Sequence, residues 1–313
     1  MRRIGAIVNR GSGHGRGGQM ERWLRLRLGE QLDLLEITQG VDLAGWARQR
    51  EALGVERILV FGGDGTFRAV ADAMESMELP LALVATGTNN NISRALGLPN
   101  DPYEATEIGL TGSPDWISAG RINGYFFLEA AGIGLEAELW PVGEAVVRRR
   151  FRDAIEGPLA LARTVPAAVE IELEEPEFHD TVSAYTMTIS NVAVTGAHLP
   201  LAPDVDIRDP ALYLNVYQSL GPMGTLRTGM DLARKRAMRP QFVTRHPFMR
   251  ARIRASEPLS VHADGTLIGT LPIEVVSIAK AVRVVMPDAA ETSATGAASG
   301  HQDRPTEETE EEG

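Results

Sequence analysis

The segment Gly62-Gly63-Asp64-Gly65-Thr66 is the part of this chain best suited to chemistry. It stands between an apolar run and a segment of helical periodicity that begins at Phe67. Glycines let the backbone approach a ligand closely, and free N–H groups at a helix N-terminus bind phosphate. Asp64 would repel a phosphate unless a divalent cation lies between them, or unless its carboxylate orients hydroxyls or amides. The alternative is a tight strand–helix turn in which Asp64 caps the helix.

Two further turns carry polar residues of the same kind. The first is Asn9-Arg10-Gly11-Ser12-Gly13-His14-Gly15, and the second is Thr86-Gly87-Thr88-Asn89-Asn90-Asn91-Ile92-Ser93-Arg94. The second offers amides, hydroxyls and one cation. No Gly-Lys-Ser or Gly-Lys-Thr follows the glycines, so no Walker loop is present. The first strand is also not followed by the glycine pattern of dinucleotide-binding folds.

The elements around these turns alternate between strand and helix. The apolar runs predict strands at 4–8, 34–37, 57–61 and 81–84, and the intervening segments predict helices at 19–32, 42–52, 67–77 and 92–96. Four strand–loop–helix repeats predict a parallel sheet with helices on both faces. Ligands bind such sheets beyond the carboxyl ends of the strands, where the three polar turns are expected to meet.

After Asp115 the pattern becomes β-rich. A hairpin is predicted to turn at Asn123-Gly124, and short strands are predicted at 169–173, 184–190, 213–217, 252–255, 258–262 and 273–277. Helices are expected at 142–152, 159–167 and 224–236. The sequence therefore predicts an α/β N-terminal domain at 1–118 and a mainly antiparallel, β-sandwich-like domain at 119–287. Residues 288–313, with eight acidic side chains against one arginine, are expected to form a disordered acidic tail.

Composition narrows the classes of protein further. The 313 residues include no cysteine and carry a formal net charge of -11. The absence of cysteine excludes disulfide scaffolds, thiol catalysis and iron–sulfur ligation. No apolar run is long enough to span a bilayer, so we expect no transmembrane segment and a cytoplasmic protein.

Positive charge is concentrated in two places. Residues 221–254 hold nine basic side chains and one acid, and a second cluster covers 148–152. These clusters could be solvated faces or could contact an anionic surface. No nucleic-acid-binding motif accompanies them, so lipid headgroups at the inner membrane face are favoured over nucleic acid.

Several motifs together resemble the diacylglycerol kinase and sphingosine kinase family, in particular its bacterial soluble lipid kinases. The resemblance rests on Gly62-Gly63-Asp64-Gly65-Thr66, on Gly87-Thr88-Asn89-Asn90 with Arg94, and on Leu96-Gly97-Leu98-Pro99. It continues through Asn9-Arg10-Gly11-Ser12-Gly13, Ala130-Ala131-Gly132-Ile133-Gly134-Leu135-Glu136-Ala137, Leu201-Ala202-Pro203-Asp204-Val205 with Asp209, and His262-Ala263-Asp264-Gly265. These landmarks cover about residues 4 to 287 in the order that the family shows.

The resemblance implies ATP bound between two domains and phosphoryl transfer to a lipid hydroxyl such as that of diacylglycerol. Asp64, which would organise Mg²⁺ and the phosphates, and Asp264 become the candidate catalytic residues, and Asp209 matches an aspartate that helps to hold a structural Mg²⁺ ion. The implied nucleotide-binding residues are Asn9, Ser12, Gly13, Thr38, Gly62, Gly63, Asp64, Gly65, Thr66, Phe67, Arg68, Gly87, Thr88 and Asn90. Phosphoryl transfer depends mainly on positioning and charge neutralisation, with one base to orient the attacking hydroxyl.

The chain departs from the family pattern at one chemically important position. The family's Asp-Gly-Glu glutamate, its general base, falls on Thr266, and threonine cannot accept a proton near neutral pH as a carboxylate can. A non-catalytic nucleotide- or lipid-binding protein of the same fold is therefore an alternative. An NAD kinase-like enzyme is a second alternative, although its usual Asn-Glu pair is replaced here by Ser190-Asn191-Val192. The acceptor lipid and the oligomeric state, a homodimer included, stay open.

Overall fold

A computed structural model describes residues 3–12, 16–134, 167–196, 198, 200–218 and 243–288. Its helices are α1 (Arg16–Leu28), the 3₁₀ helix η2 (Gly29–Gln31), α2 (Leu43–Ala52), α3 (Asp64–Ala73), α4 (Asn91–Ala95) and α5 (Pro102–Thr111). The first strands are β1 (Arg3–Val8), β2 (Leu32–Glu36), β3 (Val55–Gly62), β4 (Leu81–Ala85), β5 (Ser113–Ile122), β6 (Tyr125–Phe127) and β7 (Ala130–Gly134). The later strands are β8 (Ala167–Glu174), β9 (Phe178–Ser190), β10 (Leu212–Gln218), β11 (Val243–Phe248), β12 (Arg250–Ala255), β13 (Ser260–Ala263), β14 (Thr266–Thr270) and β15 (Ile273–Met286). The helices expected at 142–152 and 224–236, most of the one at 159–167, and the acidic tail lie outside the described residues.

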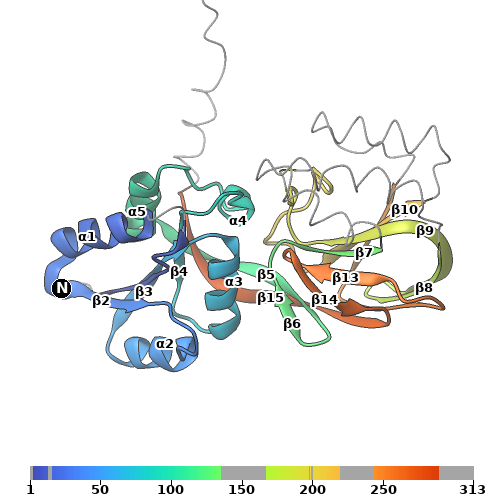
Figure 1. Cartoon of the computed structure of the whole chain (residues 1–313), viewed down its shortest axis with the longest axis horizontal. Helices are drawn as coiled ribbons and strands as arrows, with labels where there is room; N and C mark the ends of the chain where they lie inside the picture. Colours follow the sequence, from blue (N-terminus) through green and yellow to red (C-terminus); the bar gives the residue numbers. More distant parts are fainter. Residues whose placement is uncertain are drawn as a thin grey trace, which may run out of the picture.

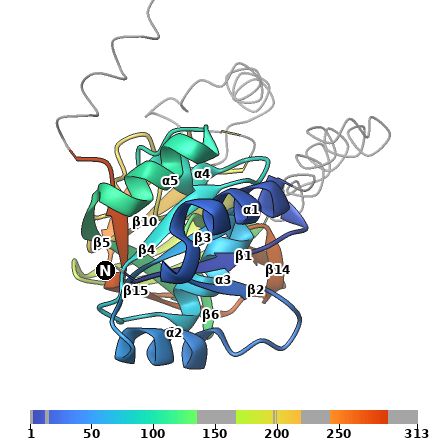
Figure 2. The same cartoon turned by 90° about the vertical axis from the view of Figure 1, so that its left-hand side faces the viewer.

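The N-terminal part is the predicted parallel sheet, with strand order β2-β1-β3-β4. Alternate residues of these strands face opposite sides. On one side, Ile7, Val60 and Leu83 pack with α2, α3 and α4, and on the other side Phe61 and Val84 pack with α1 and α5. The two layers of helices enclose the sheet in Figures 1 and 2. The α/β fold class is confirmed.

Some element boundaries differ from the sequence-based ones. Helix α1 ends at Leu28 rather than Leu32, because the chain passes through η2 and Leu32 already pairs with Ile4 in the sheet. Helix α3 begins at Asp64, three residues earlier than predicted, and ends at Ala73. Helix α5 was not predicted at all. It begins with a cap in which Asp101 accepts hydrogen bonds from two backbone N–H groups, followed by a proline in the first turn.

The C-terminal part is built from antiparallel strands. The predicted hairpin is present, since Ile122 of β5 pairs with Tyr125 of β6 across Asn123-Gly124, both of which have positive φ. Strand β9 pairs with β7, β8 and β10, and β8 pairs with β12. A separate apolar core fills this part, and its members include Phe127, Ile189 and Phe248.

One strand joins the two parts. Strand β15 pairs antiparallel with β12 at its beginning and contacts β4 near its end, through Val284 opposite Leu81. Strand β5 pairs with β15 along most of their lengths. In Figure 1 both strands run from the helical layers into the β-rich part. The carboxyl ends of β3 and β4 are thereby brought close to the loops of the second part.

Candidate active site

The three polar turns meet at the carboxyl ends of β1, β3 and β4, as the sequence predicts. Asn9 Nδ2 donates a hydrogen bond of 2.9 Å to Thr66 Oγ1. The hydroxyls of Ser12 and Thr86 lie 2.6 Å apart. These side-chain contacts connect the first turn to both of the others and hold the three loops as one surface.

Glycines allow the second and third turns to touch. A Cβ atom on Gly87 would lie 2.7 Å from the Cα of Gly63, and a Cβ on Gly62 would lie 2.4 Å from the Cβ of Thr66. Neither space admits a side chain without movement of the backbone or of Thr66. The glycine pattern is therefore a packing requirement of the site as well as a means of approaching a ligand.

Asp64 is the first residue of α3, but it does not cap that helix. Gly63 is the N-cap residue, and the carboxylate of Asp64 accepts hydrogen bonds from the backbone N–H groups of Asn91 (3.1 Å) and Ile92 (3.2 Å). The alternative in which Asp64 caps its own helix is wrong, because the side chain reaches across to the start of α4. Asp64 thus fixes the third turn against the second.

Asn91 carries this connection to a carboxylate that the sequence analysis did not select. Its Nδ2 donates a 2.8 Å hydrogen bond to Glu129 Oε2 and a 3.0 Å hydrogen bond to the carbonyl oxygen of Gly196. Glu129 lies between β6 and β7 and is only 6% exposed. The N-terminal and C-terminal parts therefore meet at a buried glutamate.

Asp264 holds the same glutamate from the other side. It lies in the turn between β13 and β14, with φ at 44°. Its carboxylate accepts hydrogen bonds from the backbone N–H groups of Leu128 (2.8 Å), Glu129 (2.8 Å) and Ala130 (3.2 Å). The two motif aspartates thus converge on the segment that carries Glu129.

These three carboxylates share a low-dielectric environment. Burial and then the charges of Asp64 and Asp264 hold the pKa of Glu129 well above its ordinary value. Burial raises the pKa of Asp264 to about 6, although three backbone hydrogen bonds and the nearby Arg68 oppose the shift. Burial also raises the pKa of Asp64, against the effect of backbone hydrogen bonds and His198. Because neighbouring buried carboxylates cannot all ionise independently, the cluster holds a proton closer to neutral pH than a single exposed carboxylate would.

Two side chains, those of His198 and Arg68, bridge the parts around this cluster. His198 Nε2 lies 2.9 Å from the carbonyl oxygen of Asn89 and 3.2 Å from Arg94 Nη2. The guanidinium of Arg68 lies 4.8 Å from the ring centre of Tyr125. Arg68, predicted to wrap nucleotide phosphates, therefore faces the β5–β6 hairpin and Asp264 in this conformation.

The other predicted nucleotide-binding residues are distributed unevenly. Gly65, Thr38 and Thr88 are exposed, Thr38 just after β2 and Thr88 in the third turn. Phe67 is fully buried in the core, so its side chain supports α3 and does not face a ligand. Asn90 has a left-handed backbone conformation. Gly13 lies outside the described residues.

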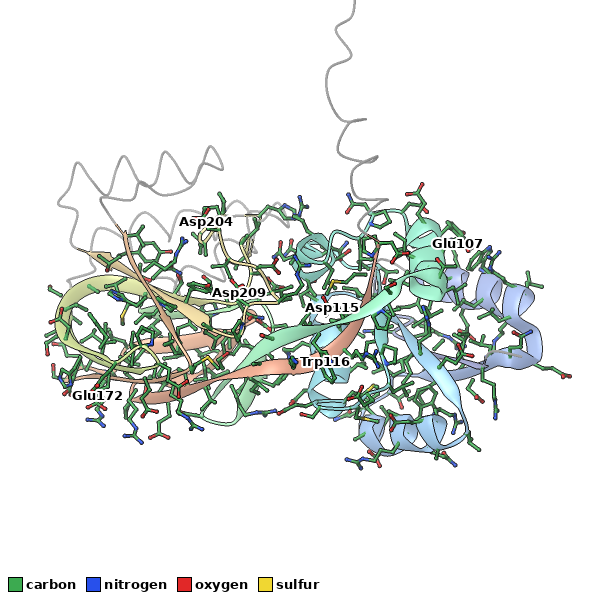
Figure 3. All side chains as sticks on the ribbon, turned by 180° about the vertical axis from the view of Figure 1, so that it is seen from behind. Glu107, Asp115, Trp116, Glu172, Asp204 and Asp209 are labelled. Carbon is green, nitrogen blue, oxygen red and sulfur yellow. The ribbon has the colours of Figure 1, made fainter. Side chains whose placement is uncertain are left out.

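Asp209, the predicted metal ligand, accepts a 2.9 Å hydrogen bond from the hydroxyl of Tyr213. The pKa of Arg208 is raised mainly by its hydrogen bond with Asp206. Asp115 and Asp209, both labelled in Figure 3, raise it by smaller amounts. Among the described residues, the only group of three side chains whose ligand atoms lie close enough to hold a metal ion is the one formed by Glu170, Glu172 and His179. The side chains around Asp209 do not form such a set, and its metal role stays a prediction.

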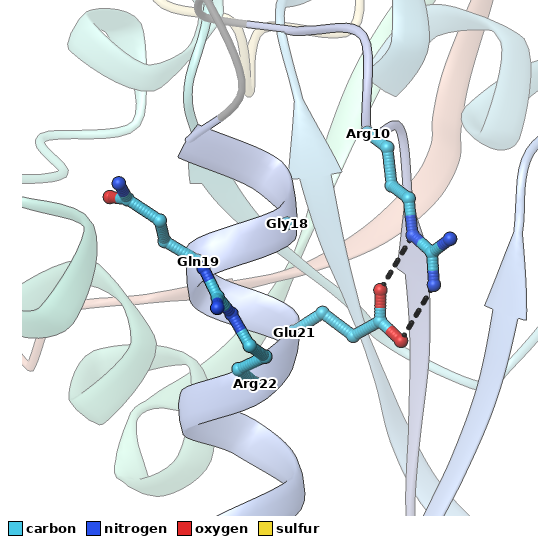
Figure 4. Close-up of a pocket in the computed structure, with 5 residues that line it drawn as sticks. All are labelled: Arg10, Gly18, Gln19, Glu21 and Arg22. Atoms are coloured by element: carbon cyan, nitrogen blue, oxygen red, sulfur yellow. Dashed lines mark hydrogen bonds and ion pairs between the residues drawn. The ribbon is translucent and has the colours of Figure 1, made fainter.

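A hollow of about 400 Å³ lies beside the first turn, at the start of α1. Figure 4 shows its lining residues, with Glu21 joined to Arg10 by two hydrogen bonds of 2.8 and 3.0 Å. The hydrogen bond from Arg10 is the largest of the effects that lower the pKa of Glu21. This hollow shares no lining residue with the carboxylate cluster, and the ion pair of Arg10 with Glu21 occupies part of its lining.

Within the basic segment 221–254, the arginines of β12 form ion pairs with glutamates of neighbouring strands. On β12, Arg252 pairs with Glu274 at 3.0 Å, and Arg254 lies 3.5 Å from Glu172. Arg250 lies 4.0 Å from Glu174. These arginines belong to cross-strand ion pairs and do not form a free cationic surface. Residues 221–242 and the cluster at 148–152 lie outside the described residues.

Comparisons with known proteins agree with this architecture. A family model described as the diacylglycerol kinase catalytic domain matches residues 3–122, and a second, the YegS C-terminal NAD kinase beta sandwich-like domain, matches residues 146–286. The chain thus carries the domains that these two family models describe, and the resemblance noted from the motifs is confirmed.

Curated relatives point to the same family, and a solved structure shares the fold. The chain is 27% identical to a diacylglycerol kinase of Bacillus subtilis (strain 168) over 79% of this chain and 82% of the relative. It is 27% identical to a probable lipid kinase YegS-like protein of Pseudomonas fluorescens (strain Pf0-1), over 75% of this chain and 77% of the relative. A crystal structure of a diacylglycerol kinase from Bacillus anthracis str. Sterne shares the fold, with a TM-score of 0.69 and 20% identity, over 92% of this chain and 98% of that one.

Sequence reasoning missed Glu129 and the side chain of Asn91 as members of the site. Glu129 carries one usable signal, since it is an acidic residue inside the run Phe126-Phe127-Leu128-Glu129-Ala130-Ala131, which is otherwise apolar. A charged residue in such a run is buried only when it is paired or functional.

Proposed function

We propose that this protein is an ATP-dependent lipid kinase that transfers the γ-phosphate of MgATP to the hydroxyl of a membrane lipid such as diacylglycerol. The observation that carries the proposal is the convergence of the turns after β1, β3 and β4 on one carboxylate cluster at the junction of the two parts. The relatives' names support a lipid acceptor.

The chemistry of the turns suits a nucleotide. The backbone N–H groups around Gly63 and Gly87 would donate hydrogen bonds to phosphate oxygens. The hydroxyls of Ser12 and Thr66 would orient the phosphates. Asn90 Oδ1 and Asn91 Oδ1 are buried acceptors for which the described residues supply no donor, so a bound ligand would complete them. The cluster of Asp64, Glu129 and Asp264 is not preassembled as a metal site. Magnesium would therefore enter with ATP as part of the substrate and neutralise phosphate charge.

Contact with a membrane belongs to the same proposal, because the acceptor resides in a bilayer. None of the helices among the described residues is long and apolar enough to cross a membrane. The acceptor would be reached from the membrane surface. Since the arginines of β12 are paired, residues 221–242 and the cluster at 148–152 remain the candidates for contact with anionic headgroups.

The test is transfer of labelled phosphate from MgATP to a panel of lipids in mixed micelles, with diacylglycerol, a sphingoid base, phosphatidylglycerol and an isoprenoid alcohol as acceptors. We expect one labelled lipid product from the wild-type protein and a loss of about 100-fold or more in Asp64→Asn, because that change replaces the carboxylate that fixes the third turn with a neutral amide. ATP binding without any labelled lipid would favour the non-catalytic alternative, for which Thr266 is the specific observation.

A further inference from the structure

The proposed reaction requires a proton acceptor, and the two motif aspartates are poorly placed to be one. Each oxygen of Asp64 accepts a backbone N–H from the start of α4. Asp264 accepts three backbone N–H groups, two of them on Oδ1. Protonating either carboxylate during turnover would remove the charge that strengthens the hydrogen bonds holding the loops in place. Both aspartates therefore act as positioning residues.

Both aspartates position the same side chain. Asp64 holds the backbone N–H of Asn91, and the Nδ2 of Asn91 donates to Glu129 Oε2 at 2.8 Å. Asp264 holds the backbone N–H of Glu129 at 2.8 Å. The carbonyl oxygen of Glu129 accepts a further 2.9 Å hydrogen bond from the backbone N–H of Asn191. Glu129 is thus fixed through its backbone and its carboxylate by residues of both parts.

Thr266, where the family resemblance places a glutamate base, offers no carboxylate at this turn. It is exposed and is the first residue of β14, two positions after Asp264. Apart from Asp264 itself, the acidic residue hydrogen-bonded to that turn is Glu129, whose backbone N–H donates to Asp264 Oδ1.

We propose that Glu129 is the general base of the transfer, an inference that rests on the proposed function. One oxygen of its carboxylate accepts the proton of the lipid hydroxyl while the hydroxyl oxygen forms a bond to the γ-phosphorus of ATP. The bond between that phosphorus and the β–γ bridging oxygen breaks, and ADP leaves with the bonding electron pair. Glu129 then releases its proton to solvent.

The electrostatic setting agrees with this role. A base works best when its pKa lies near the working pH, and burial with two neighbouring carboxylates moves the pKa of Glu129 in that direction. A hydrogen bond from Asn91 occupies one lone pair of Oε2, and each carboxylate oxygen has two. The titratable side chains that face the cluster are Asp64 and Arg68 from α3, His198, and Asp264.

The experiment compares the full-length wild-type protein with Glu129→Gln and Glu129→Asp, using labelled MgATP and the acceptor found in the lipid panel. Glutamine retains the size of the side chain and an oxygen for Asn91, so folding and nucleotide binding are preserved. We expect Glu129→Gln to lower kcat by about 100-fold or more, with the Kd for ATP and the Tm unchanged, and Glu129→Asp to retain more activity than Glu129→Gln. Glu75→Gln is the matched control, since Glu75 pairs with Arg121 outside the cluster.

The possible outcomes are distinguishable. A Glu129→Gln protein within threefold of the wild-type kcat would overturn the assignment and leave the lipid kinase intact. A loss of activity matched by an equal loss of ATP affinity, or by a lower Tm, would assign Glu129 a structural role and overturn it too. A wild-type protein that transfers no phosphate to any acceptor would overturn the proposed function, and the base with it.

Discussion

At the scale of single residues, the cost of burying a carboxylate is the main physical constraint on this site. Asp64 and Asp264 offset that cost with backbone hydrogen bonds. Glu129 accepts fewer backbone hydrogen bonds, and burial followed by the charges of Asp64 and Asp264 holds its pKa well above the ordinary value. A protein rarely retains a group that is this costly for stability alone, because an uncharged side chain of similar size would be cheaper to bury. The residue that is least stabilised in the cluster is therefore the one best suited to exchange a proton.

A rescue experiment tests the position of the base. Adding Thr266→Glu to Glu129→Gln should raise kcat at least about tenfold over Glu129→Gln alone, since a carboxylate in the β13–β14 turn would restore proton acceptance near the same point. Position 266 is exposed, so the longer side chain can be accommodated. Phosphate transfer to the lipid at saturating MgATP is the measurement. A double variant no faster than the single one would contradict the placement of this chemistry beside the turn.

The motif residues could be predicted from the sequence, but their partners could not. Gly62 to Thr66 and Asp264 stand out by type and spacing, whereas the hydrogen bonds of Asp64 join residues 27 and 28 positions apart. The role of Asn91 depends on its Nδ2 meeting Glu129, which no local pattern reveals. Phe67 was assigned to the nucleotide by its place in the motif, while the 3.6-residue period of α3 turns its ring into the core.

At the scale of elements, the site depends on two strand–helix turns that touch backbone to backbone. Gly63 precedes α3, and Gly87 follows β4 at the end of the neighbouring strand. Their close approach lets Asp64 reach the start of α4, so a small separation of the turns would disturb the whole hydrogen-bonded chain. Rigid placement by two adjacent parallel strands is what keeps this arrangement in register.

Substitution of Gly87 by alanine tests this dependence. A Cβ atom 2.7 Å from the Cα of Gly63 must push the turns apart, because that Cα is a backbone atom and cannot rotate away as a side chain could. We expect a loss of about 1–3 kcal/mol in the free energy of unfolding, together with weaker ATP binding. The matched control is Gly18→Ala in α1, where a Cβ would meet no atom within 4 Å and helix propensity favours alanine. Chemical denaturation and ATP titration measure both effects, and an unchanged Gly87→Ala protein would contradict the close contact.

The order of elements in the N-terminal part was predictable because each strand, turn and helix carries its own local signal. Asp42 as the cap of α2 is an example, with its side chain accepting from the backbone N–H of Gly45. The missed helix α5 shows the limit of periodicity. Its buried face consists of Ala105, Thr106 and Gly109, which are small or polar and give little apolar periodicity. Its clearest signals are the Asp101 cap and the following proline.

At the scale of the whole molecule, the two parts are joined mainly by β5 and β15. The sheet contact between β15 and β4 involves a single residue pair, Val284 opposite Leu81. Hydrogen bonds from Asn91 and His198 add a second connection close to the carboxylate cluster. The candidate active site thus lies at the junction itself. The sequence could predict two parts but not this shared strand, because pairing between β15 and β4 depends on segments about 200 residues apart.

The central claim is that the turns after β3 and β4 bind the nucleotide. Its most direct test is to measure amide hydrogen exchange with and without MgATP and to locate the peptides that become protected. Binding should slow exchange in peptides that cover 62–68 and 86–92, since these turns would enclose the phosphates. Peptides from the hollow at the start of α1, around Gln19 and Arg22, should remain unchanged. If ATP binds with measurable affinity but protects only the α1 region, or neither turn, the nucleotide site assigned here is contradicted.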